Sequence, residues 1–274
     1  MADALFDDAQ LRGMPAGTWT VGELSTQVAR VLAGAFPDDV WVAGQIRNLN
    51  RSSAGHVYFD LAEPTAGGEV PKAQLSVTLL APERHVVNEQ LKRAGGAVRM
   101  DDGIEVRLVG RVRWYGPRGT VQLRMHGIDP AFTLGRLEAD RDRILAALAA
   151  EGLLDRNGRL AMPAVPLRVG LVTSVGSAAH ADVLATLEAS GIGFVVRQVH
   201  ARTQGPDCGP QVAAALARVA AAGVDVVLLV RGGGARTDLA AFDTDRIARA
   251  IATLDVPVLT GIGHEIDRTI ADEV

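Results

Sequence analysis

Three consecutive glycines follow an arginine in the second half of this chain. The run is Arg231-Gly232-Gly233-Gly234, directly after the apolar segment 224–230. Glycines let backbone N–H groups converge on an anion, and a neighbouring guanidinium can bind phosphate oxygens through two hydrogen bonds. No Gly-Lys-Ser/Thr sequence follows, which disfavours nucleotide hydrolysis by the P-loop route. The run predicts a phosphate site, and the alternative is a flexible turn with a solvated arginine.

A histidine and an aspartate follow the next predicted strand. The segment 261–267 places His264 three residues before Asp267, so both would share one side of a helix that begins there. A histidine beside a carboxylate is a common pair in general acid–base catalysis. A metal site is the weaker interpretation, because a second imidazole at zinc-ligand spacing is absent. A structural role for His264 stays open.

Small residues lead from a third predicted strand into a helix. Ser174 opens this segment, and Asp182 is expected in the first part of the helix, facing the same crevice as the glycines. The alternative for Asp182 is a partner of the helix dipole, and His180 is expected to be solvated. Among the acids after the glycines, Asp238 could orient the arginine or bind a cation, whereas Asp243 is predicted to cap a helix.

The second half alternates apolar strands with amphipathic helices. Continuous apolar strands and crossover helices are typical of a parallel sheet covered on both faces. Ligands of such sheets bind at the carboxyl ends of the strands, where all three segments above lie. The predicted strands are 168–174, 194–200, 224–230 and 256–260, and the predicted helices are 181–189, 210–222 and 244–254.

The first half has short alternating segments that predict an oligonucleotide-binding (OB) fold, a five-stranded barrel. Thr20 and Glu23 form the pattern of a capping box for a preceding helix, whose apolar stripe consists of Val21, Leu24, Val28, Val31 and Leu32. The predicted strands are 41–48, 56–61, 74–80, 104–115 and 120–128, with a helix at 82–91. The predicted domains are therefore 1–130 (OB fold with its leading helix), 131–166 (connecting helix 133–153 and linker) and 167–274 (α/β domain).

Arginines and aromatic residues alternate along the predicted barrel strands. Basic groups that follow a backbone and aromatic rings that stack on bases are how proteins hold single-stranded nucleic acid. Strand alternation places one of Tyr58 and Phe59, and one of Trp114 and Tyr115, in the core. The alternative is a solvated arginine face. The candidate nucleic-acid ligands are Arg47, Arg51, Tyr58, Arg111, Arg113, Trp114 and Arg124.

The composition is that of a globular protein of about two domains, with 274 residues, 48% hydrophobic content and a net charge of −4. No apolar run approaches the length of a membrane span. The acidic N-terminus lacks the features of a signal peptide, so we expect a cytoplasmic protein without membrane contact. The single cysteine, Cys208, is expected to be an incidental loop thiol.

Several motifs in this order resemble the exodeoxyribonuclease VII large subunit. They are Val21-Gly22-Glu23-Leu24, residues 41–46, residues 55–61, residues 171–174 followed by Asp182, the glycine run, and Gly263-His264-Glu265-Ile266-Asp267. The resemblance implies a hydrolase that degrades single-stranded DNA from both ends to oligonucleotides, with no strictly required cofactor and Mg²⁺ as an optional aid. It also implies that Asp182, Arg231, His264 and Asp267 are catalytic and that a small subunit is the partner.

Two departures from the family pattern limit this expectation. The family has Ser-x-Glu-Asp after the glycines, whereas this chain has Ala235-Arg236-Thr237-Asp238. Family members also continue beyond the equivalent of Val274 into helices that recruit the small subunit, so the resemblance implies a truncated chain whose activity alone stays open. A non-catalytic single-stranded DNA-binding fragment is the main alternative, and a nucleotide-binding regulator is a third.

Overall fold

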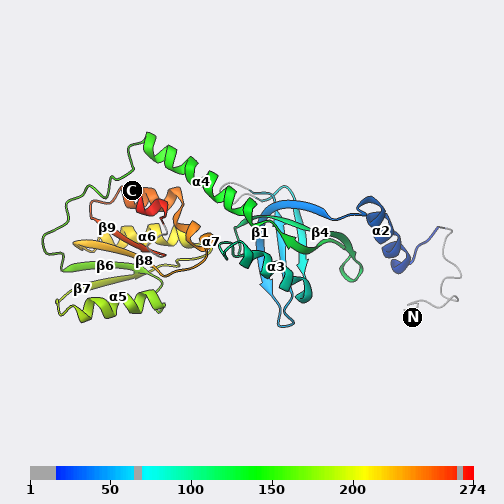
Figure 1. Cartoon of the computed structure of the whole chain (residues 1–274), viewed down its shortest axis with the longest axis horizontal. Coiled ribbons are helices and arrows are strands. Elements are labelled where there is room, and N and C mark those ends of the chain that lie inside the picture. Colours follow the sequence, from blue (N-terminus) through cyan, green and yellow to red (C-terminus); the bar gives the residue numbers. More distant parts are fainter. Residues whose placement is uncertain (1–16, 65–69, 264–267) are drawn as a thin grey trace.

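The computed structural model describes residues 17–64, 70–263 and 268–274. A closed barrel and a parallel sheet lie at opposite sides of the molecule, and the long helix α4 (Pro130–Ala150) runs from one toward the other (Figure 1). The predicted combination of an OB-fold barrel with a parallel α/β region is confirmed.

The barrel consists of β1 (Val40–Arg51), β2 (Val57–Ala62), β3 (Gln74–Leu79), β4 (Glu105–Tyr115) and β5 (Thr120–Ile128), closed in the order β1-β2-β3-β5-β4. Helix α3 (Ala81–Arg93) lies between β3 and β4 in the chain. Alternate residues of the strands fill the interior, as the pleat requires. The fully buried side chains of this core include Ile46, Leu79, Leu108, Leu123 and Met125.

Helix α2 (Val21–Ala35) flanks the barrel and begins with the predicted capping box, in which Thr20 and Glu23 exchange hydrogen bonds. Ser25 accepts a hydrogen bond from the indole N–H of Trp114 in β4 at 2.8 Å. The predicted apolar stripe is only partly correct, since Val21 is 82% exposed and Leu24 and Val31 also face solvent. The helix docks through half-buried residues that include Val28 and Leu32 of the predicted stripe, together with Ser25 and Ala29.

Helix α4 begins three residues earlier than predicted. Asp129 caps it by accepting hydrogen bonds from the amides of Ala131 and Phe132, and Pro130 occupies the first helical position, where its missing N–H costs nothing. The guanidinium of Arg107 pairs with Asp129 and lies 5.2 Å from the centre of the Phe132 ring. The start of α4 is therefore fixed to the barrel wall.

The parallel sheet has the order β7-β6-β8-β9, formed by β6 (Arg168–Thr173), β7 (Val195–His200), β8 (Val226–Arg231) and β9 (Val258–Ile262). Helices α6 (Cys208–Ala220) and α8 (Asp245–Ala252) cover one face and α5 (Ala178–Ala189) the other (Figure 1). The core on the α6 and α8 side is aliphatic apart from Cys208 and Phe242. Its central members are Val172, Leu216, Val227, Leu229, Phe242 and Ile247.

Asn157 lies in the predicted linker within residues 131–166, but its side chain is buried. The residue is 3% exposed. Its Nδ2 donates to the carbonyl oxygens of Ile251, Leu254 and Val256, and its Oδ1 accepts from the amide of Val258 at 2.8 Å. The linker is thus attached to the sheet domain between α8 and β9.

The two halves contact each other at α7 (Arg236–Leu239), which is followed by the short helix η2 (Ala240–Phe242). Thr237 is 5% exposed and bonds to the barrel segment 97–99. Its amide donates to the carbonyl of Ala97 at 3.2 Å, and its hydroxyl accepts from the amide of Arg99 at 2.9 Å. The helix after the glycine run is therefore held by the barrel.

Candidate functional site

The carboxyl ends of β6 and β8 form the central crevice of the parallel sheet. These neighbouring strands pair in register from Val169 with Val226 to Val172 with Leu229, and the chain order along the sheet reverses between them. At such a switch point the connections leave toward opposite faces, so the two strand ends open a crevice for a ligand. The crevice is bordered by the loop 174–177 and by the glycine loop, which we define as residues 232–235.

Arg231 lies beneath the glycine loop and faces the α6 side of the sheet. It is the last residue of β8 and alternates with the core residues Val227 and Leu229, so its side chain points to the same face and is 3% exposed. Its Nη1 donates to the carbonyl of Gly232 at 2.8 Å, and its Nη2 lies 3.6 Å from Asp238 Oδ2. The guanidinium therefore supports the loop and places a positive charge behind it.

Gly234 is required by the close approach of this guanidinium. A Cβ atom at Gly234 would lie 2.5 Å from Arg231 Nη1, which is closer than nonbonded atoms approach, whereas a Cβ at Gly232 would lie 3.6 Å from Ala179 Cβ. The distance of 3.6 Å between a Cβ at Gly232 and Ala179 Cβ shows that the glycine loop lies against the first turn of α5. The two predicted anion-binding segments are thus adjacent.

Two histidines, which were not predicted as site residues, hold the loop after β6. The amide of Val175 donates to His200 Nδ1 at 3.1 Å, and the amide of Gly176 donates to His180 Nδ1 at 3.3 Å. His180 Nε2 lies 2.8 Å from Gln198 Oε1, so His180 is half-buried and bonded to β7, contrary to the prediction that it is solvated. The loop after Ser174 is therefore fixed by side chains from α5 and β7.

Asp182 is exposed and lies one helical turn beyond Ala179, the residue that faces Gly232. This position brings it to the side of α5 that borders the crevice. His264 and Asp267 lie outside the described residues. The two residues just before His264 lie beside the start of the glycine loop. Ile262 pairs with Arg231, and the amide of Gly263 donates to the Arg231 carbonyl at 3.1 Å.

The acids after the glycine loop have structural roles. Asp238 pairs with Arg231 and accepts a hydrogen bond from the amide of Ala235 at 3.3 Å, in agreement with the expectation that it orients the arginine. Asp243 is not the helix cap that was predicted, because Thr244 occupies that position of α8. Asp243 instead accepts from the amide of Ile270 at 2.7 Å, and burial raises the pKa of its carboxyl.

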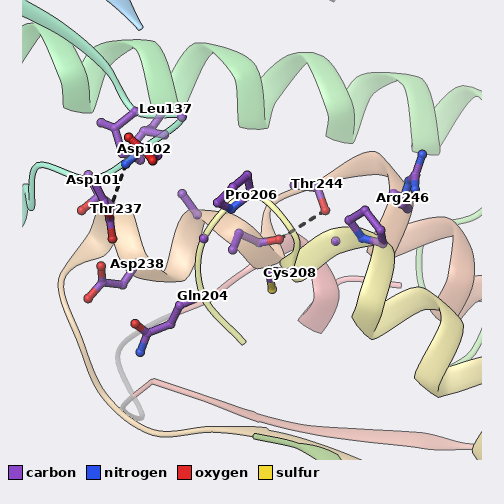
Figure 2. A pocket seen from close by; sticks show the side chains of 17 residues that line it. Asp101, Asp102, Leu137, Gln204, Pro206, Cys208, Thr237, Asp238, Thr244 and Arg246 are labelled. Atoms are coloured by element: carbon purple, nitrogen blue, oxygen red, sulfur yellow. Dashed lines mark hydrogen bonds between the residues drawn. The ribbon is translucent and has the colours of Figure 1, made fainter. Parts of the chain in front are cut away.

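A pocket of about 410 Å³ lies between the barrel loop 101–104, α4 and the start of α6 (Figure 2). Three carboxylates line it, those of Asp101, Asp102 and Asp238. Cys208 also borders it but is 1% exposed at the first position of α6, so the prediction of an incidental loop thiol is wrong. The negative charge disfavours phosphate in this pocket.

On the barrel, the strand pairings bring one row of side chains to the outer surface. Tyr58 pairs with Thr78, Thr78 with Arg124, and Arg124 with Arg111, across β2, β3, β5 and β4. The next outward positions of β4 are Arg113 and Tyr115. We define Tyr58, Thr78, Arg111, Arg113, Tyr115 and Arg124 as the barrel face. All of these residues except Arg111 line a groove of about 810 Å³, which is also lined by Asn50, Leu80, Trp114, Arg118 and Gln122.

The aromatic residues of this face follow strand parity. Tyr58 is 42% and Tyr115 43% exposed, whereas Phe59 is buried and Trp114 is half-buried and bonded to Ser25. Phe59 is therefore in the core, as predicted, whereas Trp114 bonds to α2 and lines the barrel-face groove, so neither member of the second pair belongs to the core. Tyr115 is the exposed member of the second pair, and the predicted nucleic-acid ligands included Trp114 but not Tyr115. Residues 111, 113 and 115 lie on the same face of β4, so the outward direction of Arg111 and Arg113 could have identified Tyr115.

Carboxylates already bind two arginines of the barrel face. Arg124 pairs with Glu83 at 2.7 Å and Arg111 with Asp39 at 2.9 Å. These hydrogen bonds hold the pKa values of both carboxyls below their usual range. A phosphate must therefore compete with these carboxylates, while Arg113 has no carboxylate within ion-pair distance among the described residues.

The remaining two candidate arginines lie along β1 and away from this row. Arg47 is half-buried opposite Asp60 and donates to Gln45 Oε1 at 3.3 Å. Arg51 ends the strand and donates to the carbonyl of Met100 at 3.1 Å. Only Arg51 is exposed, in a separate groove near α3.

Within the ranges 17–64, 70–263 and 268–274, no group of three or more His, Cys, Asp or Glu side chains is arranged to hold a metal ion. Over the same ranges, no helix is both long and apolar enough to span a bilayer.

Comparisons with known proteins match both halves of the chain. Residues 153–274 match the family described as Exonuclease VII, large subunit, and residues 19–129 match the OB-fold nucleic acid binding domain. The exodeoxyribonuclease 7 large subunit of Moorella thermoacetica is 37% identical over 256 residues, which cover 93% of this chain and 60% of that protein. The corresponding protein of Koribacter versatilis is 32% identical over 257 residues, covering 93% and 52%.

This chain therefore spans between about half and three-fifths of the length of these two relatives. Among solved structures, the N-terminal domain of PriB from Thermoanaerobacter tencongensis matches 34% of this chain with 94% of its own length, at 16% identity and a TM-score of 0.23.

Proposed function

We propose that this chain acts in the hydrolysis of single-stranded DNA. As its motifs indicated, it is similar to exodeoxyribonuclease VII large subunits over 93% of its length. The finer proposal is degradation from both ends to oligonucleotides, within a hetero-oligomer that contains a small subunit. One observation supports this proposal. The chain combines an OB barrel, whose outer face presents arginines and tyrosines, with a glycine loop at the switch point of a parallel sheet.

The barrel face holds the single strand in this proposal. Tyr58 and Tyr115 offer exposed rings on which bases stack, and Arg111, Arg113 and Arg124 offer guanidinium groups to the phosphates. Stacking requires bases that are not paired in a duplex, and each stack contributes about 1–3 kcal/mol. This arrangement favours single strands without reading their sequence.

The scissile phosphate binds in the crevice between β6 and β8. In this proposal the amides of the glycine loop bind it, and Arg231, which bonds to the Gly232 carbonyl, supports the charge that develops on its oxygens from behind the loop. A water oxygen attacks phosphorus while the bond to the leaving ester oxygen breaks. His264, oriented by Asp182 or Asp267, moves a proton from the water or to the leaving oxygen, so the products are one phosphate end and one hydroxyl end.

The same proposal covers the setting of the reaction. The partners are single-stranded DNA and the small subunit, the location is the cytoplasm, no cofactor is strictly required and Mg²⁺ is an optional aid. Asp182, Arg231, His264 and Asp267 are the proposed catalytic residues, with Ser174 and Gly232 to Gly234 as phosphate ligands.

One observation favours a second function, that of a non-catalytic single-stranded DNA-binding fragment. The Arg231 side chain is 3% exposed and engaged with Asp238 and Gly232, so it does not reach into the crevice. The barrel face, in contrast, is open to solvent at Tyr58 and Tyr115.

Labelled single- and double-stranded DNA, incubated with the chain alone and with the small subunit, separates these functions. We expect cleavage of single strands, with and without chelator, to be lost in Asp182→Asn and His264→Ala while binding to the oligonucleotide is kept. Arg93→Ala, on the exposed surface of α3, serves as the matched control. Unchanged cleavage in the two variants would contradict the catalytic assignment, and binding without cleavage in every combination would support the second function.

A further inference from the structure

A second groove, of about 510 Å³, lies between the barrel and the glycine loop. It extends along α3 and the end of β1, and it ends at Gly234, Ala235 and Asp238. Figure 1 shows α7, which begins just after Ala235, at the side of the sheet domain that is nearest the barrel. We call it the α3 groove.

The charge of the α3 groove is opposite to that of the whole chain. Four basic side chains line it, those of Arg51, Arg84, Lys92 and Arg99, against one carboxylate, that of Asp238. The chain as a whole carries a net charge of −4. A cleft lined by one sign of charge concentrates ligands of the other sign, so this groove attracts an anion.

Two of these guanidinium groups are held in place by backbone atoms. Arg51 Nη2 donates to the Met100 carbonyl at 3.1 Å, and Arg84 Nη1 donates to the Gly55 carbonyl at 2.9 Å. A guanidinium has five N–H donors, so each keeps donors for a ligand after this contact. Because they are already oriented, a bound phosphate costs less side-chain entropy.

The floor of the groove is apolar. It is formed by Leu49, Val57, Leu79, Val87 and Leu91, which belong to or border the barrel core. A cationic rim above an aliphatic floor suits a nucleotide chain, whose phosphates are charged and whose sugars and bases present apolar surface. An isolated inorganic anion would use only the rim.

The α3 groove also adjoins the barrel face at the end of β1. Consecutive residues, Asn50 and Arg51, line the barrel-face groove and the α3 groove respectively, and Thr78 and Leu79 of β3 do the same. Consecutive strand residues point to opposite sides, so the two grooves lie on opposite sides of these strands. A DNA strand that leaves Tyr58 therefore passes around the end of β1 at Arg51 to enter the α3 groove, which ends at Gly234.

We propose that the α3 groove is a second binding site for the backbone of single-stranded DNA, with Arg51, Arg84 and Arg99 as phosphate ligands, and that it leads the strand from the barrel face to the glycine loop. The proposal rests on the proposed function, because it requires that the chain binds single-stranded DNA. It adds a route between two sites that the family resemblance leaves unconnected.

Fluorescence anisotropy with labelled oligothymidylate of about 8 and about 30 nucleotides tests this route, since one OB fold occupies about 4–16 nucleotides. The groove variant is Arg51→Ala with Arg99→Ala, the barrel-face variant is Arg113→Ala, and Arg93→Ala is the matched control on α3 outside the groove. For the long oligonucleotide, we expect the groove variant to bind several-fold more weakly. Its slope of log affinity against log salt should fall by about 1.4, at about 0.7 per lost phosphate contact.

The outcomes separate the two proposals. Loss of affinity for the long oligonucleotide in the groove variant but not in Arg93→Ala supports the route. Equal affinity of the groove variant and the unaltered chain, with Arg113→Ala weakened at both lengths, overturns the groove and keeps the proposed function. If the unaltered chain binds neither oligonucleotide, the proposed function itself fails.

A second measurement guards against a groove variant that does not fold. The unaltered chain is crosslinked by ultraviolet light to a thiothymidine oligonucleotide, and the attached peptides are identified by mass spectrometry. Crosslinks to residues 79–100 support the proposal. Crosslinks confined to the barrel face overturn it.

Discussion

Gly234 and Arg231 depend on each other, because the guanidinium occupies the space that a side chain at position 234 would need. In Gly234→Ala, the new Cβ pushes the guanidinium away from Asp238 and from the Gly232 carbonyl. We expect the free energy of unfolding, measured in urea, to fall by about 1–3 kcal/mol, as for overpacked core positions. Gly232→Ala is the matched control, since its Cβ would meet Ala179 at an ordinary contact distance of 3.6 Å. Equal losses in both variants would contradict this role of Gly234.

Cys208 is a buried thiol whose ionisation is suppressed. Burial raises its pKa to about 11, and the positive charge of Arg231 offsets only part of this effect. Because the thiolate is the reactive form, we expect native Cys208 to react with a disulfide reagent at pH 8 far more slowly than in urea. The native rate should keep rising with pH beyond 9, the ordinary value for the unfolded thiol. A rate that levels off at pH 9 in the folded protein would show that the burial effect is absent.

Asn157 connects the linker to α8 and β9 through four side-chain hydrogen bonds. In Asn157→Ala, the amide of Val258 and the carbonyls of Leu254 and Val256 lose this partner, while the Ile251 carbonyl keeps the amide of Leu254. Unsatisfied buried groups cost about 1–3 kcal/mol each. We expect a loss of about 3 kcal/mol in the free energy of unfolding and faster hydrogen exchange at the Val258 amide. The matched control is Asn88→Ala on the exposed surface of α3, where a change within about 0.5 kcal/mol is expected. Similar losses at both positions would refute the special role of Asn157.

The secondary elements were largely predictable from local patterns. The alternation of apolar and polar residues predicts the ends of all five barrel strands to within three residues, because one face of each strand is buried and the other is exposed to solvent. The start of α4 was missed by three residues, although Asp129-Pro130 is a good helix-start signal. Asn157 was not predictable, since an Asn-Gly pair in a loop and a buried asparagine with four tertiary partners have the same local sequence.

The sequence predicted which segments form the site better than it predicted how their side chains are oriented. The glycine loop, Ser174 and Asp182 do lie at neighbouring strand ends, as the βα alternation implies. The inward direction of Arg231 depends on strand parity at the last residue of β8 and on Asp238, a partner seven residues further along. His180 and His200 were missed because their bonds to the loop 174–177 exist only once β7 and α5 are packed against it.

At the scale of the whole molecule, α4 and the Thr237 contact place the barrel beside the sheet, so one strand of DNA can touch both. Attachment at a first site raises the effective concentration at the second, so modest contacts on each half combine into a larger affinity. The acidic net charge limits nonspecific attraction of duplex DNA outside these basic surfaces.

The preference for single strands should depend on the two tyrosines of the barrel face. A duplex keeps its bases stacked on each other and can offer only phosphates to Arg113 and its neighbours, whereas a single strand can also stack on Tyr58 and Tyr115. In Tyr58→Leu with Tyr115→Leu, we expect single-strand affinity to fall by about 1–3 kcal/mol per lost stack, while duplex affinity stays nearly constant. Anisotropy titrations with an oligothymidylate and a duplex of the same length measure both affinities at one salt concentration. Val121→Ala, an exposed apolar position of β5 outside the barrel face, serves as the control. If both DNA forms lose affinity equally, the tyrosines do not stack on bases, and the preference for single strands must come from the backbone contacts alone.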